Sequence, residues 1–156
     1  MKLLIPEPLT AEAFAPFGKV IEADPSKAIE INSGFTTRYH ALAKAEVGEG
    51  NAIISIFDGR PRPLEIDMLE RHPLGSQAFM PLERRNWLSV VADHPEASAC
   101  RAFLCSGNQG VQYAAGTWHF PLLVLGQPQQ FLVVDRSGKE DNLDEIYLDD
   151  PLLISL

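Results

Sequence analysis

A carboxylate, a histidine and a carboxamide lie within eight residues of one another, in the run Glu70-Arg71-His72-Pro73-Leu74-Gly75-Ser76-Gln77. A second histidine, His119, ends the stretch Gly116-Thr117-Trp118-His119, which lies among turn and strand signals. Imidazole nitrogens and carboxylate oxygens bind divalent transition metals, and the same groups are common general acids and bases. The two stretches together predict one site for metal binding or proton transfer.

The register before Glu70 supports this prediction. Leu64, Ile66 and Met68 alternate with charged residues, which is the pattern of a strand with one buried face. Glu70 and His72 continue the buried face, and polar groups there cost free energy unless they are paired or bound. The Pro-Leu-Gly turn that follows would return the chain beside this strand and bring Gln77 close.

Each of these residues also has a purely structural interpretation. His72 and His119 can be core histidines bonded to backbone carbonyls, and Glu70 can pair with an arginine. Gln77 can anchor the turn through its amide. His94, in the turn Asp93-His94-Pro95, is expected to be solvated.

The elements that must hold these residues are mostly short strands, separated by turns that use twelve prolines and eleven glycines. A short helix is predicted over 10–14, with Thr10 as its N-cap. The pattern predicts a single all-β domain over 1–156, either a barrel or a jelly roll. The expected strands are 19–23, 29–32, 51–57, 64–70, 87–92, 101–105, 111–113, 121–125, 131–134 and 145–148.

The composition is that of a globular protein, with 46% hydrophobic and 22% charged residues among 156. No apolar run is long enough for a membrane span, and the first residues are too weakly apolar for a secretory signal, so a cytoplasmic location is expected. The net charge of -8 argues against nucleic acid and anionic membranes as partners. Cys100 and Cys105 are expected to be buried thiols, because their odd spacing makes a mutual disulfide awkward.

The two stretches resemble the paired metal-binding motifs of cupin barrels. The first cupin motif is His-x-His, four further residues and Glu, and Glu70-x-His72-(x4)-Gln77 has this spacing with two substitutions. Gly116-x-x-His119 has the spacing of the second. The sequences of several longer segments closely resemble one family, the ureidoglycolate lyases. These segments are Glu70 to Phe79, Gln109 to Tyr113, Trp118 to Leu122, Ile31 to Gly34, Arg38 to His40 and Phe131 to Arg136.

This resemblance implies a cupin-like double-stranded β-helix, usually dimeric, that splits ureidoglycolate into glyoxylate and urea during allantoin breakdown. It implies a divalent metal, usually attributed as nickel, with the ligands Glu70, His72, Gln77 and His119. Glu70 or His40 would act as general base or acid, beside His72 and His119. The substrate is a small carboxylate, and its expected contacts are Asn32 on the ureido group, Arg38 on the carboxylate, Gln77, and the walls Phe79 and Trp118.

The chain departs from the family pattern in three places. Ala41 stands where an acidic residue is typical, Ala114-Ala115 where His-Arg is common, and Phe120 where a second histidine follows. Four polar residues at these three places are thus replaced by apolar ones, which leaves two alternatives open. One is a non-catalytic cupin that binds a small acid, and the other is a cupin lyase or isomerase for another 2-hydroxy acid.

Overall fold

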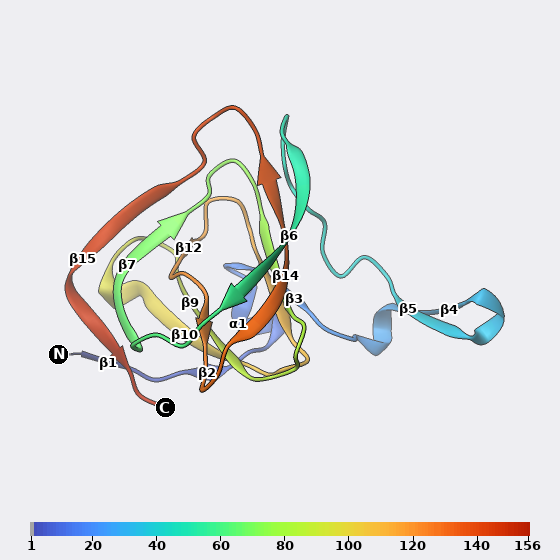
Figure 1. The fold of residues 1–156 in the computed structure, drawn as a ribbon, viewed down its shortest axis with the longest axis horizontal. Helices are drawn as coiled ribbons and strands as arrows, with labels where there is room; N and C mark the ends of the chain where they lie inside the picture. The colour runs from blue at the N-terminus through green and yellow to red at the C-terminus, as the bar shows by residue number, and fades with distance from the viewer. Residues whose placement is uncertain (1) are drawn as a thin grey trace.

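The computed structural model describes residues 2–156. About half of these residues form β-strands, and most of the strands curl into a barrel (Figure 1). Two sheets face each other across its interior. The larger sheet has eight strands in the order β1-β15-β7-β12-β9-β10-β2, with β13 paired to β9. Their bounds are β1 Lys2–Leu4, β2 Glu7–Pro8, β7 Glu65–Arg71, β9 Trp87–Ala92, β10 Cys100–Cys105, β12 Trp118–His119, β13 Leu123–Val124 and β15 Asp144–Ile154.

The smaller sheet has five antiparallel strands in the order β3-β11-β8-β14-β6. Inward-facing residues alternate with outward-facing ones along each strand, and the inward-facing residues of this sheet form an apolar interior face. Phe79, Val111, Phe131 and Val133 are among the buried residues of this face. The bounds are β3 Gly18–Ile21, β6 Asn51–Gly59, β8 Gln77–Pro81, β11 Gly110–Tyr113 and β14 Gln129–Ser137.

One short helix, α1 (Ala11–Phe14), lies between β2 and β3 in the chain. The Thr10 hydroxyl accepts a hydrogen bond from the Ala13 backbone N–H at 3.1 Å, so the predicted N-cap is confirmed. Phe14 is fully buried and packs edge-on against Phe103. Three single-turn 3-10 helices complete the helical part: η1 Pro25–Lys27, η2 Asn32–Gly34 and η3 Ala97–Ala99.

The all-β, cupin-like jelly-roll prediction is confirmed by these two facing sheets. The strand predicted over 121–125 is shorter than expected, because only Leu123–Val124 pairs with β9. Cys100 and Cys105 are buried and free, as expected. Within residues 2–156, no helix has the length and apolar character needed to cross a membrane.

The strands β4 (Ala28–Ile31) and β5 (Thr36–Tyr39) form a separate two-stranded hairpin. Figure 1 shows this hairpin extending from one side of the barrel, well away from the curled sheets. Residues 28–40, which include it, are called the arm below. All of the arm is exposed except Ile31, which is half-buried. The sequence predicted an extended segment over 29–32, but neither the second strand of the hairpin nor its separation from the barrel.

Candidate metal centre and active site

Glu70, His72 and His119 meet inside the barrel. Glu70 and His119 are paired across β7 and β12, and His72 follows the end of β7. The distance between His119 Nε2 and Glu70 Oε1 is 3.5 Å, and the two imidazole centroids are 5.4 Å apart. One ligand atom from each residue lies within 4.8 Å of the other two. The structure therefore brings together three of the four ligands that the sequence predicted.

Backbone carbonyls hold both imidazoles in one tautomer. His72 Nδ1 lies 2.9 Å from the Asn142 carbonyl oxygen, and His119 Nδ1 lies 3.0 Å from that of Thr117. A carbonyl only accepts, so each Nδ1 carries the proton and donates, which leaves a lone pair on Nε2. Among the described residues, both buried Nε2 atoms lack a hydrogen-bond partner. A carbonyl behind the ring and a free nitrogen in front is the arrangement of a metal-binding histidine.

The Glu70 carboxyl supplies negative charge to this cluster. Burial raises its pKa, but the contact with His119 and the positive charge that His119 and His72 can carry outweigh burial. The net pKa is below the usual value, so the group is a carboxylate at neutral pH. Two imidazole nitrogens and one carboxylate oxygen form a ligand set that suits nickel, zinc, manganese or iron. These three residues therefore fit a divalent metal.

The turn that carries His72 is held by distant parts of the chain. The Asn142 backbone oxygen accepts the hydrogen bond from His72 Nδ1, and the Asn142 Oδ1 accepts a hydrogen bond from the Leu74 N–H at 2.8 Å. The Gly116 N–H donates to the His72 carbonyl at 2.9 Å and so ties the two sequence motifs together. Gly116 adopts a φ of +81°, a conformation that favours glycine. Asn142 was missed by sequence reasoning, since its 70-residue separation from His72 leaves no local signal.

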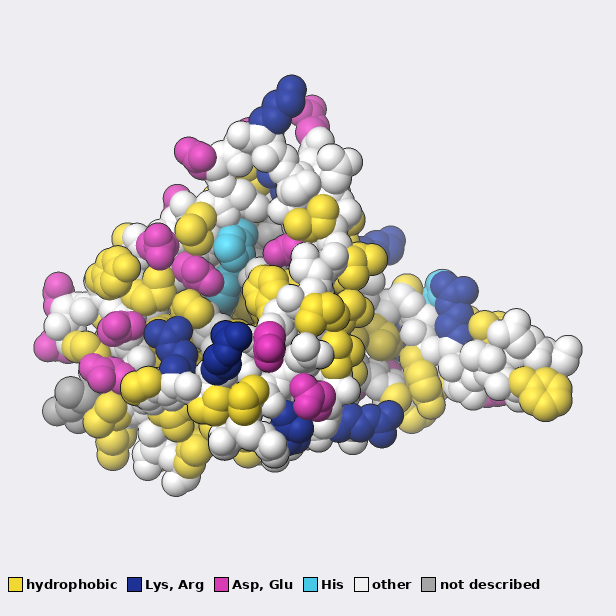
Figure 2. Space-filling model, in the orientation of Figure 1, with side chains coloured by type: hydrophobic (Ala, Val, Ile, Leu, Met, Phe, Trp, Pro, Cys, Tyr) yellow, Lys and Arg dark blue, Asp and Glu magenta, His cyan; other side chains and the backbone are white. Residues whose placement is uncertain are grey.

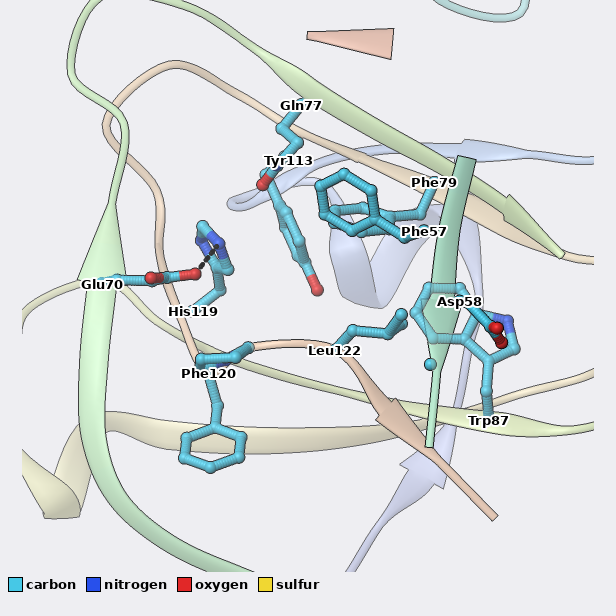
Figure 3. A pocket seen from close by; sticks show the side chains of 12 residues that line it. Phe57, Asp58, Glu70, Gln77, Phe79, Trp87, Tyr113, His119, Phe120 and Leu122 are labelled. Carbon is cyan, nitrogen blue, oxygen red and sulfur yellow. Dashed lines mark ion pairs between the residues drawn. The ribbon is translucent and has the colours of Figure 1, made fainter. Parts of the chain in front are cut away.

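A cavity of about 310 Å³ opens beside Glu70 and His119. Figure 2 shows histidine side chains within a hollow on this face of the barrel. Tyr113 stacks on the His119 ring with centroids 4.3 Å apart and an interplanar angle of 12°, which fixes the imidazole plane (Figure 3). The lining residues are Phe57, Asp58, Gly59, Glu70, Gln77, Phe79, Trp87, Tyr113, His119, Phe120, Pro121 and Leu122.

Gln77 is buried in the cavity wall on β8, beside Tyr113 of β11 (Figure 3). Its Nε2 donates to Asp135 Oδ2 at 3.1 Å, so the amide orientation is set from behind. The Oε1 atom is buried and has no partner among the described residues. This oxygen can accept a hydrogen bond from a ligand or bind a metal.

The sequence around this cluster matches a known protein family. The family model described as ureidoglycolate lyase matches residues 1–155. The chain belongs to the ureidoglycolate lyase family.

Curated members of the ureidoglycolate lyase family match along nearly their whole length. A protein named ureidoglycolate lyase from Pseudomonas syringae pv. syringae is 53% identical over 163 residues, covering 100% of this chain and 96% of the relative. Another from Burkholderia mallei is 52% identical, covering 99% of this chain and 95% of the relative. A solved structure of Bacillus subtilis oxalate decarboxylase covers 90% of this chain and 29% of its own, at 14% identity and a TM-score of 0.41.

The two aromatic residues predicted to contact substrate lie on different sides of the barrel wall. Phe79 lines the cavity and packs edge-on against Phe57 at a centroid distance of 5.6 Å. Trp118 does not line it, because adjacent residues of a strand face opposite ways and His119 takes the inward direction. The Trp118 ring instead lies 4.7 Å from the Arg71 guanidinium carbon. Trp118 thus packs in a buried cluster outside this cavity, and the substrate contact predicted for it has no support from the geometry of a single chain.

Asn32, Arg38 and His40 do not join the cluster within one chain. All three are exposed on the arm, and Figure 1 shows the arm pointing away from the barrel that carries it. The Asn32 amide donates to the Thr36 hydroxyl at 3.1 Å, a contact inside the arm itself. Their expected roles as general base and substrate contacts therefore have no support from the geometry of a single chain.

The positions where this chain departs from the family pattern lie outside the metal cluster. The Phe120 ring lies 4.7 Å from the Arg62 guanidinium carbon, and in Figure 3 it points away from His119. Ala114 and Ala115 are exposed on the loop before β12. Ala41 lies at the root of the arm and, with Ala114, lines a separate cavity. None of these substitutions removes a group from Glu70, His72 or His119.

Proposed function

We propose that this protein is a ureidoglycolate lyase, which cleaves ureidoglycolate into glyoxylate and urea. One observation carries the proposal. The buried Nε2 atoms of His72 and His119 have no hydrogen-bond partner within residues 2–156 and lie close to the Glu70 carboxylate, beside a cavity of about 310 Å³. A cavity of this size suits a small substrate. The full-length similarity to proteins named ureidoglycolate lyase supports the choice of reaction.

We propose that Glu70, His72 and His119 hold a divalent metal, with nickel as the first metal to test. When bound, the metal would supply Lewis acidity that makes the substrate hydroxyl more acidic. The backbone carbonyls of Asn142 and Thr117 keep both Nε2 atoms directed at the ligand position. The barrel thus presents the donors already oriented, which limits the reorganisation needed on binding.

The reaction needs one proton moved between two atoms of the substrate. The Glu70 carboxylate accepts the hydroxyl proton on its second oxygen, Oε2. The O–H electron pair then forms the carbonyl of glyoxylate, the C–N bond breaks, and its electron pair leaves with the urea nitrogen. The same nitrogen takes the proton back from Glu70, so protons balance. This transfer by a positioned carboxylate is typically worth about 10²–10⁴ in rate.

Gln77 is proposed to bind the ureido group rather than to act as the fourth metal ligand. Its Oε1 is free to accept an N–H bond, and Asp135 fixes the amide from behind. A Gln77→Ala change should raise KM and leave the metal content unchanged. Loss of metal from this variant would instead favour the role of Gln77 as a ligand.

The proposed setting follows from the substrate. Ureidoglycolate arises in allantoin breakdown, a part of purine catabolism, so we propose that the protein acts there, in the cytoplasm. We also propose that it works as a homodimer.

The test is stoichiometric product release. Purified protein with ureidoglycolate should yield urea and glyoxylate in equal amounts, well above the spontaneous rate, and a panel of other 2-hydroxy acids should not react. Urea at only the spontaneous rate with each of nickel, zinc, manganese and iron would refute the proposed lyase activity. Binding of glyoxylate without turnover would then point to the non-catalytic cupin, and turnover of another acid to a different lyase or isomerase.

A further inference from the structure

Most polar side-chain atoms that line the cavity accept hydrogen bonds. Asp58 and Glu70 supply carboxylates, which only accept when ionised. Gln77 Oε1 and His119 Nε2 are buried acceptors without a partner within residues 2–156. An occupant that carries oxygen atoms of its own therefore needs a hydrogen-bond donor from another part of the cavity wall.

The N–H groups of the lining side chains are already engaged. Trp87 Nε1 donates to a backbone carbonyl at 3.0 Å. Gln77 Nε2 donates to a carboxylate behind it, and His119 Nδ1 lies 3.0 Å from a backbone carbonyl. Among the side chains that line the cavity in the described part of the chain, the Tyr113 hydroxyl is thus the remaining donor. A tyrosine hydroxyl is protonated at neutral pH, so it can donate.

The Tyr113 hydroxyl is paired with a serine on the opposite sheet. Tyr113 ends β11 in the smaller sheet, and Ser89 lies on β9 in the larger one. Their hydroxyl oxygens are 2.8 Å apart, and either oxygen can be the donor. Both residues are buried, so this bond crosses the interior of the barrel. Within residues 2–156, neither hydroxyl makes a second hydrogen bond.

The two hydroxyls have two protons, and the bond between them uses one. Ser89 does not line the cavity, so a spare proton on Ser89 would lie in the core without an acceptor, which costs free energy. When Ser89 donates to Tyr113, the spare proton is that of Tyr113, which does line the cavity. Figure 3 shows the Tyr113 hydroxyl directed into the space between the lining side chains. The pair therefore offers one directed donor to an occupant.

Gln77 complements this donor. Gln77 and Tyr113 lie directly opposite each other on β8 and β11, so their side chains point to the same side of the sheet. Gln77 offers an acceptor and Tyr113 offers a donor. A ureido group carries N–H donors and a carbonyl acceptor, so its chemistry matches both residues.

We propose that Tyr113 is a catalytic residue that donates a hydrogen bond to the ureido carbonyl oxygen of the substrate, and that Ser89 is a positioning residue that donates to Tyr113. When the C–N bond breaks, its electron pair passes to the ureido group, and the carbonyl oxygen shares the negative charge. The hydrogen bond therefore strengthens in the transition state, and no proton leaves Tyr113. The Ser89 bond into the phenol oxygen makes the Tyr113 O–H a stronger donor. The choice of this oxygen rests on the proposed function, whereas the donor itself does not.

Removal of the Tyr113 hydroxyl tests the catalytic role. Tyr113→Phe keeps the ring on His119, so its metal content should equal that of the wild type. Its kcat should fall by about 10²-fold, the usual effect of losing one donor to a developing negative charge. KM should change much less than kcat, because the bond strengthens only in the transition state. A wild-type kcat in this variant would overturn the inference.

A double-mutant cycle tests the positioning role of Ser89. Ser89→Ala alone should lower kcat by about 3–10-fold. In the Tyr113→Phe background the same change should have almost no further effect on kcat, because Ser89 acts through the hydroxyl that is already gone. Urea denaturation of each variant measures the structural part of the bond. If both variants lose stability but keep the wild-type kcat, the pair only ties the two sheets together and the inference is wrong.

Tyr147→Phe is the matched control, since it removes the same atom from a tyrosine that is 71% exposed on β15 and does not line the cavity. This variant should keep the wild-type kcat and KM. A loss of kcat as large as that of Tyr113→Phe would show that the effect is not specific to the cavity, and would overturn the inference.

Binding of ureidoacetate separates the donor from the lyase activity. This molecule has the ureido group and the carboxylate of the proposed substrate but lacks its hydroxyl, so it cannot be cleaved by the same route. Calorimetry should show that Tyr113→Phe binds it about 5–10-fold more weakly than the wild type and Tyr147→Phe do. If the wild type releases no urea, the proposed function fails, and this difference still supports the Tyr113 donor. Equal affinities, including no binding by any of the three proteins, would overturn the inference.

Discussion

The barrel interior and the arm carry similar residue types, yet their environments differ completely. In the barrel, His72 and His119 are each fixed by a backbone carbonyl, and their free nitrogens face Glu70. On the arm, His40 and Arg38 are exposed. This difference shows that residue type alone does not make a binding site. The surrounding backbone decides whether a histidine is a ligand or a solvated side chain.

The difference between the two regions is tested most directly by replacing one histidine in each of them. His72→Ala should remove the metal and lower turnover by ~10³-fold or more, because a Lewis acid contributes several kcal/mol to the transition state. His40→Ala should leave the metal content unchanged. Metal analysis of both variants, alongside kcat, gives the answer. Metal loss from His40→Ala would contradict the separation of the two regions.

A substitution in the barrel interior should lower the free energy of unfolding far more than a substitution in the arm. Phe131 is fully buried, so Phe131→Ala should lower the free energy of unfolding by about 3–5 kcal/mol. Thr37→Ala removes only an exposed hydrogen bond to Glu30 and should change it by no more than ~0.5 kcal/mol. Urea denaturation at equal protein concentration measures both. A large loss from Thr37→Ala would mean that the arm is part of the folded core.

The stacked ring of Tyr113 sharpens the account of the barrel. Tyr113→Leu removes the ring that lies on His119 and should weaken metal affinity by about 10–100-fold, the usual effect of disturbing a group behind a ligand. Tyr113→Phe keeps the ring and loses only the hydroxyl bond to Ser89, so it should retain most of the affinity. Competition with a metal-sensitive dye measures both. Equal losses would assign the effect to the hydroxyl.

The reactivity of thiols should also differ between the barrel and the arm, and this is the smallest of the expected effects. Burial raises the pKa of the Cys100 thiol to about 11, and burial also raises the pKa of Cys105. The thiolate is the reactive form, so at pH 8 both should alkylate slowly, and the Cys100 rate should rise as the pH approaches 11. A Thr37→Cys thiol on the arm should react at the rate of a free thiol. Rapid native alkylation of Cys100 at pH 8 would contradict a closed barrel.

Much of the barrel could be predicted from local patterns. Period-two alternation before Glu70 predicted both the strand and its inward face, and Thr10 predicted the helix cap. These features depend on a few adjacent residues, which is why local sequence patterns predict them.

The remaining features depend on contacts between distant segments. Asn142 holds the His72 turn from 70 residues away, and Asp135 orients Gln77 from 58 residues away. The position of the arm depends on the same kind of information. An extended segment was predicted over 29–32, near β4, but no local pattern states whether a hairpin folds back onto its own barrel or extends from it.

The most direct test of the central claim is the metal stoichiometry of the wild-type protein, measured with turnover before and after chelation. The account predicts about one divalent metal per chain, loss of urea and glyoxylate production on chelation, and recovery when the metal is restored. Release of urea at the full rate from metal-free protein would contradict the roles of Glu70, His72 and His119 as metal ligands in the reaction.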